Sequence, residues 1–190
     1  YLLMEENNKK NILLKTKNGI LYSNLSGQHT VRINMGMPNF KWNKIPLSRE
    51  MDYKNLNIKI SSKDGKEIAG GFSLNVGNPH VVFFVENVDN FNLNEIGPKI
   101  ENHNYFPEKC NVTLASIKSR NLVKVKVWER GAGLTKACGT AACATAVAAN
   151  LESLSNTKTE IEFSLGKLLI KIDNKNSIHM KGPVSDIKEI

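Results

Sequence analysis

Residues 139–150, with the sequence GTAACATAVAAN, constrain the fold more than any other stretch of the chain. Nearly every side chain in this run is small, and the run is apolar on all its sides, which predicts a helix surrounded by other backbone. We expect this helix to span residues 139–154. A fold for the chain therefore has to wrap its remaining elements around one slender helix.

Most of the remaining sequence is typical of β-strands. The run NLVKVKVWE alternates strictly and predicts a strand with Val123, Val125 and Val127 on one face and lysines on the other. Asn18 and Gly19 lie between two apolar runs, which predicts a hairpin with a type I′ turn. Further strands are predicted in HTVRINMG, GFSLNVGNPHVVFFV, IEFSLGKLLIKID and SIHMKG.

A second, shorter helix is predicted over residues 92–104, where Gly97 and Pro98 are tolerated near its first turns. The sequence therefore predicts the α+β class, with a mostly antiparallel sheet wrapped around helices. The Pro-containing and polar stretch MGMPNFKWNKIPLSRE is typical of a crossing between two lobes, so a boundary is expected near residues 35–46.

Apolar runs in the sequence are too short for a membrane span, and no secretory core region is present. The three cysteines, Cys110, Cys138 and Cys143, form no C-x-x-C pair, which argues against a zinc site and against a disulfide framework. Free thiols are typical of a reducing compartment. A cytoplasmic protein with no membrane partner and no metal is the expectation.

The net charge of +8 raises the alternative of a basic nucleic-acid-binding module. Only four of the 26 basic residues are arginines, and the lysines are scattered among acidic residues. They form no stripe interleaved with aromatic side chains. A solvated surface is the better interpretation, and no nucleic-acid partner is expected.

Cys138 stands just before the predicted helix of small residues. The N-terminus of a helix carries unpaired N–H groups and a partial positive charge, so it favours anions. We expect this position to lower the pKa of the Cys138 thiol. Gly139 lets a ligand approach the backbone, and Thr140 offers both an amide and a hydroxyl group. A buried structural thiol is the alternative, but the pattern favours a reactive cysteine.

Glu129 and Arg130 end the alternating strand and precede a Gly-x-Gly turn. Arginine presents a fork that matches a carboxylate, and glutamate accepts hydrogen bonds from an ammonium group. Together with the helix N-terminus they predict a zwitterionic ligand with a carboxylate, although an ion pair on the surface fits the spacing equally well. Asn78 and His80, in the turn VGNPH, are further candidates for a cleft.

Several motifs, taken in order, resemble the diaminopimelate epimerase family. They are VGNPHVVFFV, IGPKIENHNYFPEKCNVTL, VKVWERGAGLTKACGTAACATAVAA, GKLLIKI and MKGP, and MGMPNF resembles the crossing between the domains of that family. The resemblance implies an isomerase that interconverts LL- and meso-diaminopimelate without pyridoxal phosphate or metal, in lysine and peptidoglycan-precursor synthesis. It also implies a homodimer.

The fold implied by this resemblance has two pseudo-similar domains, each a sheet curled around a central helix. Two cysteines, one per domain, act on opposite faces of the substrate α-carbon. Carried over by motif, the acid–base and supporting roles fall on Cys138, His80 and Glu129, and contacts with the substrate fall on Asn78, Asn111, Glu129, Arg130, Gly139 and Thr140. A related racemase of the same fold, similar to proline racemase, remains an alternative.

The sequence departs from the family pattern in three places. Ala141 stands where many members have Gly, and Lys109 and Cys110 stand where Arg and Thr are commoner. The C-G-N-G motif of the other catalytic cysteine occurs nowhere in the chain, and YLLMEENN resembles the last turns of its helix. We therefore expect a truncated first domain over residues 1–38, a second domain over residues 39–180 and a returning segment over residues 181–190. The chain by itself is expected to be inactive.

Overall fold

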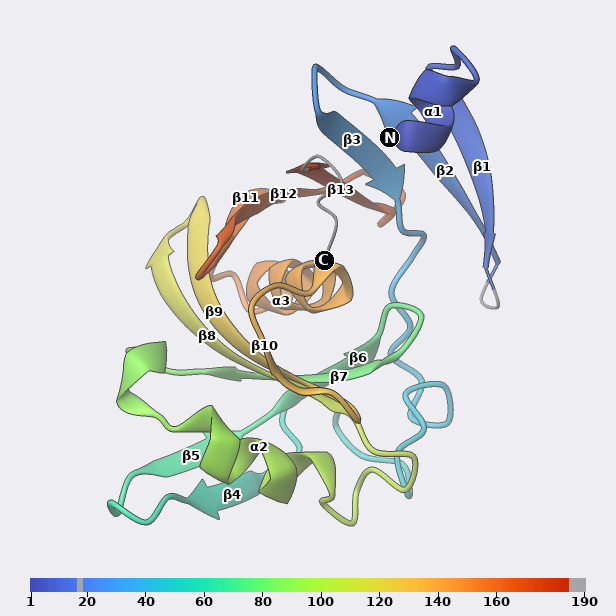
Figure 1. Ribbon diagram of the computed structural model, residues 1–190. Coiled ribbons are helices and arrows are strands. Elements are labelled where there is room, and N and C mark those ends of the chain that lie inside the picture. The colour runs from blue at the N-terminus through green and yellow to red at the C-terminus, as the bar shows by residue number, and fades with distance from the viewer. Residues whose placement is uncertain (17–18, 185–190) are drawn as a thin grey trace.

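The computed structural model describes residues 1–16 and 19–184. Helix α3 (Gly139–Leu151) lies at its centre, and strands curve around it (Figure 1). All residues from Ala141 to Ala149 are buried, so the prediction of a helix surrounded by other parts of the chain is confirmed. The helix ends earlier than predicted because Ser153 adopts a positive φ of 59°, and the N–H groups of Leu154 and Ser155 turn back to the carbonyl of Ala149.

Within the described residues, one large sheet has eleven strands, and its central part curves around α3. Along the sheet the order is β1-β2-β3-β13-β12-β11-β9-β8-β7-β6, with β10 paired to β9. Most neighbours are antiparallel, whereas β11 pairs with β9, and β7 with β8, in parallel. The predicted α+β class is thereby confirmed. The strands are β1 (Asn11–Thr16), β2 (Gly19–Leu25), β3 (Thr30–Asn34), β6 (Phe72–Asn75), β7 (Pro79–Phe84), β8 (Asn111–Ser119), β9 (Leu122–Glu129), β10 (Gly133–Thr135), β11 (Lys158–Phe163), β12 (Gly166–Ile172) and β13 (Ile178–Pro183).

The strands β7, β8 and β9 lie between two apolar cores. The predicted alternation holds, because Val123, Val125 and Val127 face the core around α3. On the other face, Val112 and Leu114 of β8 pack in a second core with α2 (Leu93–Glu101), which follows the short 3₁₀ helix Val88–Asn90. This middle layer of strands therefore fixes α2 and α3 relative to each other.

Helix α2 confirms the second predicted helix but is shorter than residues 92–104. The side chain of Asn92 caps it by accepting a hydrogen bond from the N–H of Asn94, at 3.1 Å. Beside α2 lies a separate hairpin, β4 (Ile58–Ser61) with β5 (Glu67–Gly70). This hairpin was not predicted, although Asp64-Gly65 in its turn is a typical hairpin signal.

The N-terminal elements form an arm beside the body around α3, which Figure 1 shows at its upper right. Helix α1 (Leu2–Glu6), whose Met4 is buried, precedes strands β1 to β3, and β3 joins the main sheet by pairing with β13. The pairing of Thr16 with Gly19 in β1 and β2 confirms the predicted hairpin, whereas Asn18 in its turn lies outside the described residues. Residues 185–190 of the predicted returning segment also lie outside them. None of the helices in the described part of the chain is long and apolar enough to cross a membrane.

Candidate active site

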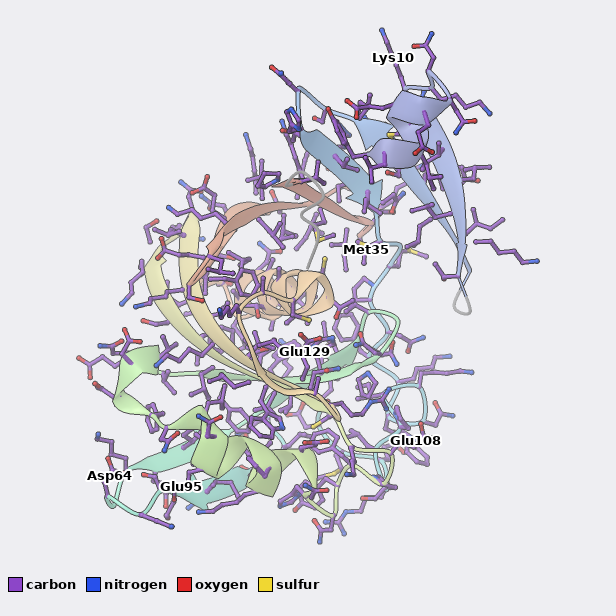
Figure 2. All side chains as sticks on the ribbon, viewed as in Figure 1. Lys10, Met35, Asp64, Glu95, Glu108 and Glu129 are labelled. Atoms are coloured by element: carbon purple, nitrogen blue, oxygen red, sulfur yellow. The ribbon has the colours of Figure 1, made fainter. Side chains whose placement is uncertain are left out.

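Cys138 lies at the N-terminus of α3, where it is the residue that precedes the first helical turn. Its side chain is buried, and its Sγ donates a hydrogen bond to Oε2 of Glu129 at 3.2 Å. The hydroxyl oxygen of Thr140 lies 3.5 Å from the same sulfur. Glu129 comes from the end of β9 and sits beside α3, as its label in Figure 2 shows. The strand end and the helix N-terminus thus bring a thiol and a carboxylate together.

The expectation that the pKa of Cys138 is lowered at the helix N-terminus is wrong, because the pKa is raised overall. Burial of the thiol raises its pKa, and the hydrogen bond and negative charge of Glu129 raise it further. The hydroxyl of Thr140 and the backbone N–H of Ala141 act in the opposite direction but do not outweigh these effects. Cys138 is therefore held as a protonated thiol beside a carboxylate.

Gly139 lies between Cys138 and Thr140, and a side chain at this position would press against Met180. A Cβ atom on Gly139 would lie 3.0 Å from Sδ of Met180, a residue of β13. The N-terminus of a helix carries N–H groups that favour an anion. Thr140 also lines a hollow of about 510 Å³, together with Asn78.

Asn111 connects two of the segments that carry predicted site residues. Its Nδ2 donates to the carbonyl of Pro79 at 2.9 Å, and its Oδ1 accepts from the backbone N–H of Arg130 at 3.0 Å. Asn111 is also paired with His80 across the parallel strands β7 and β8. Each end of the amide can make one more hydrogen bond, so contact with a substrate remains a prediction.

His80 is fully buried, and its Nε2 lies 2.9 Å from Oδ1 of Asn78. Burial lowers the pKa of His80 from 6.5 to about 3, and the positive charge of Arg130 contributes to this shift. The imidazole is therefore neutral at physiological pH. Its Nδ1 is buried and has no hydrogen-bond partner among the described residues.

Arg130 is exposed, and its guanidinium donates to the carbonyl of Glu108 at 2.9 Å. The following residue, Gly131, donates its N–H to the carboxylate of Glu101 at 3.1 Å. Sequence reasoning missed Glu101, because nothing in the pattern of α2 indicates that its last residue reaches the turn after β9. The predicted site residues therefore form one connected set, from Asn78 and His80 through Asn111 to Arg130, Glu129 and Cys138.

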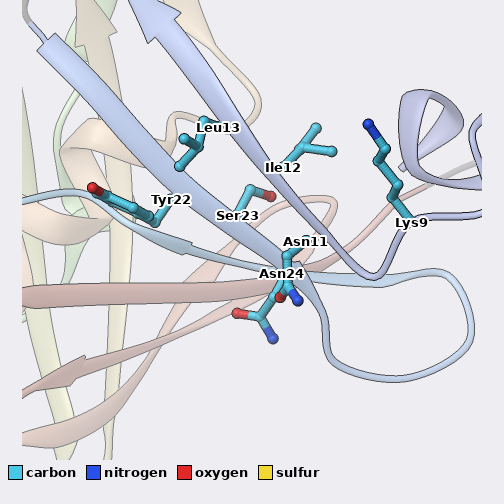
Figure 3. A pocket seen from close by; sticks show the side chains of 7 residues that line it. All are labelled: Lys9, Asn11, Ile12, Leu13, Tyr22, Ser23 and Asn24. Carbon is cyan, nitrogen blue, oxygen red and sulfur yellow. The ribbon is translucent and has the colours of Figure 1, made fainter.

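Two hollows of similar size differ in what lines them. The hollow of about 510 Å³ at the N-terminus of α3 lies between β2, residues 35–37 and the turn at residues 76–78. A groove of about 570 Å³ lies on β1 and β2 (Figure 3), and it contains none of the predicted site residues. In the described part of the chain, no group of three or more His, Cys, Asp and Glu residues is arranged to hold a metal ion.

Comparisons with known proteins agree on one family. A sequence model of the family described as diaminopimelate epimerase matches residues 72–187. The diaminopimelate epimerase of Pelagibacter ubique is 58% identical over 100% of this chain and 69% of its own length. That of a Wolbachia species is 39% identical over 97% of this chain and 68% of its own length. The chain thus spans about two thirds of the length of these relatives.

Solved structures agree on the fold. A hydroxyproline epimerase from Agrobacterium vitis, at 10% identity, superposes with a TM-score of 0.63 over 91% of this chain and 56% of its own. A protein from Pseudomonas aeruginosa described as a predicted epimerase, at 13% identity, also has a TM-score of 0.63, over 96% of this chain and 67% of its own. These two likenesses show the fold alone. The sequence comparisons lead to one conclusion: the chain belongs to the diaminopimelate epimerase family, a family of isomerases.

Proposed function

We propose that this chain supplies one acid–base half of a diaminopimelate epimerase, with Cys138 as the group that exchanges a proton with the substrate α-carbon. The observation that carries the proposal is the hydrogen bond of 3.2 Å from Sγ of Cys138 to Oε2 of Glu129, at the N-terminus of α3. A thiol and a carboxylate at this distance can pass a proton between them.

The proton moves in two steps in this proposal. Glu129 accepts the proton of the Cys138 thiol, and the resulting thiolate removes the α-proton of the substrate to leave a carbanion. In the reverse direction the thiol returns a proton to the carbanion and recovers one from Glu129. The raised pKa of the thiol suits the second direction in particular, because it keeps Cys138 protonated at rest.

The carbanion needs stabilisation by donors that are already in place. The N–H groups at Gly139 and Thr140 are candidates for the substrate α-carboxylate, and the positive end of α3 adds to their effect. We assign the remaining polar groups of the substrate to Asn78, Asn111 and Arg130. Neutral His80 supports the site through its hydrogen bond with Asn78.

Inversion at the α-carbon needs a second acid–base group on the opposite face of the substrate. The other two cysteines, Cys110 and Cys143, are fully buried, so neither can reach a bound ligand. Burial raises the pKa of the Cys143 thiol to about 12, and it also raises that of Cys110. We therefore expect this chain by itself to lack epimerase activity.

Solvent exchange tests the proposal. The chain is incubated in deuterium oxide with LL-diaminopimelate and, separately, with meso-diaminopimelate, and both α-deuterium and interconversion are measured. We expect exchange at only one configuration of the α-carbon, no interconversion, and loss of exchange in Cys138→Ala. Three results would contradict the proposal: interconversion, exchange that persists in Cys138→Ala, and no exchange in the folded wild-type chain. Circular dichroism checks the fold of both proteins.

The sequence relatives favour diaminopimelate over the two alternative functions, which are a racemase similar to proline racemase and a nucleic-acid-binding module. Three further parts of the proposal are the cytoplasm as location, the homodimer and the absence of nucleic-acid and membrane partners. The three cysteines are free thiols, as is typical of a reducing compartment. A mobility-shift assay at two salt concentrations tests nucleic-acid binding, which falls steeply with salt when phosphates are contacted.

A further inference from the structure

Glu101 is a buried carboxylate outside the set of site residues described above. It is the last residue of α2 and is only 5% exposed. Its Oε2 accepts a hydrogen bond of 2.6 Å from Nε1 of Trp128, and its Oε1 accepts one of 3.1 Å from the N–H of Gly131. The Nζ of Lys109 lies 3.9 Å from Oε1. Both carboxylate oxygens are thus directed at the end of β9 and the turn that follows it.

Stability of α2 does not explain a carboxylate at this position. A negative charge at the C-terminus of a helix is unfavourable because it lies at the negative end of the helix dipole. Burial of a charged group is a further cost unless hydrogen bonds compensate for it. The hydrogen bonds from Trp128 and Gly131 supply that compensation. A buried carboxylate at this position is therefore explained by its role in holding Trp128 and Gly131.

The segment that Glu101 holds is the one that carries Glu129 and Arg130. Trp128 and Gly131 are the residues on either side of this pair, and both donate to the same carboxylate. The backbone of Arg130 is fixed separately by Asn111, at 3.0 Å. With the residues on both sides of it held in this way, Glu129 keeps freedom only in its side chain. That side chain reaches Cys138.

We infer that Glu101 is a positioning residue: it fixes Trp128 and Gly131 so that the carboxylate of Glu129 stays beside the thiol of Cys138. The inference rests on the proposed function, in which Glu129 exchanges a proton with that thiol. The substitution Glu101→Gln keeps the shape of the side chain but replaces one acceptor by an NH₂ group. That NH₂ group faces either the indole N–H or the N–H of Gly131, so one buried donor loses its partner.

The reactivity of Cys138 reports the position of Glu129 without any need for catalysis. The groups that act on the thiol are Glu129 from β9, and Thr140 and the N–H of Ala141 from α3. When the carboxylate of Glu129 moves away, the thiolate forms more readily and alkylation becomes faster. The rate of alkylation by iodoacetamide is measured from pH 7 to 10, in the chain with Cys110→Ala and Cys143→Ala so that Cys138 is its only cysteine.

We expect Glu129→Gln to increase the alkylation rate at pH 8 by about threefold or more, because it removes the negative charge beside the thiol. Glu101→Gln should change the rate and its pH profile in the same direction. In the double variant, Glu101→Gln should add nothing to the effect of Glu129→Gln. A general loosening of the structure would instead add to the effect of Glu129→Gln, and that result would overturn the inference.

Glu95→Gln is the matched control. Glu95 also lies on α2, and its carboxylate also accepts from a backbone N–H, that of Lys63 at 2.8 Å. It lies far from Glu129 in Figure 2, so its substitution should leave the profile of Cys138 unchanged. An unchanged profile in Glu101→Gln, or an equal change in Glu95→Gln, would overturn the inference. Failure of the exchange experiment alone would instead count against the proposed function.

Discussion

At the scale of the residue, His80 shows how burial sets the protonation state of a site. Its imidazole is enclosed by the sheet, bonded to Asn78 and near the positive charge of Arg130. In the unfolded chain the pKa of histidine is near 6.5, whereas in the folded protein that of His80 is about 3. The site therefore contains a neutral histidine throughout the physiological range.

This difference predicts how stability depends on pH. Because the folded pKa is the lower one, the unfolded chain binds a proton first as the pH falls below 6.5. The contribution of His80 is fully present above pH 6.5 and is lost progressively down to about pH 3, a change on the order of 5 kcal/mol. Urea unfolding from pH 8 to 4 should show a clearly smaller loss of stability in His80→Gln, which retains an N–H donor for Asn78.

Proton NMR provides the direct check on His80. Its imidazole resonance, identified by its absence from the spectrum of His80→Gln, should not move between pH 7.5 and 5. A resonance that titrates near pH 6.5, or a pH slope that His80→Gln leaves unchanged, would show that the buried imidazole takes up a proton in the folded protein.

At the scale of the element, the close packing of α2 on β9 depends on Gly97. A Cβ atom at this position would lie 2.7 Å from Cγ and Cδ2 of Trp128, whose indole is held by Glu101. Replacing a helical Gly by Ala gains about 1 kcal/mol in helix propensity, and forcing an atom into a packed interface costs about 1–3 kcal/mol. Since the indole cannot move without losing its hydrogen bond, the steric cost should dominate.

We therefore expect Gly97→Ala to lower the free energy of unfolding by about 1–2 kcal/mol, measured by urea denaturation at pH 7.5. Trp128→Leu is the matched background, because a flexible leucine can rotate away from the new methyl group. In that background Gly97→Ala should cost little or should stabilise. An equal loss in both backgrounds would mean that the indole is not the obstacle.

The elements also show what the sequence could predict. The sequence predicted α3 from the run of small residues at 139–150, and β9 from the alternation of Val123, Val125 and Val127. Each pattern is compatible with only one type of secondary structure that buries its apolar side chains. The end of α3 was misjudged because the positive φ of Ser153 depends on local backbone contacts that no apolar pattern reveals. The hairpin of β4 and β5 was missed although its turn signal was present.

At the scale of the whole molecule, the candidate site is assembled from distant segments. The family motifs named Cys138, Glu129 and His80, but the spacing of these residues could not reveal the buried amide of Asn111 that connects their strands. It also could not show that burial and Glu129 raise the pKa of Cys138, since these effects arise only when β9 meets α3. Glu101 was missed for the same reason: its contacts join α2 to a turn 30 residues further along the chain.

The arm of the molecule presents an apolar face. Leu13, Ile20 and Tyr22 are exposed by 61%, 57% and 62%, and Leu13 is paired with Tyr22 across β1 and β2. Figure 3 shows Leu13 and Tyr22 side by side. Strand β1 also ends the strand order of the sheet, so its outer edge is unpaired within the described sheet. Exposed apolar side chains next to an open strand edge favour association between chains.

We expect this face to make the chain self-associate. Sedimentation velocity measures the association between 1 and 100 µM, roughly the range in which modest interfaces are populated. Because each copy carries a net charge of +8, repulsion opposes association and salt screens that repulsion. Association through apolar contacts should therefore strengthen as salt is raised. Leu13→Thr with Tyr22→Thr keeps β-propensity but should weaken association by about tenfold or more. Leu165 is 72% exposed between β11 and β12, and the control substitution Leu165→Thr should leave association unchanged. A chain that stays monomeric at high salt would contradict the prediction.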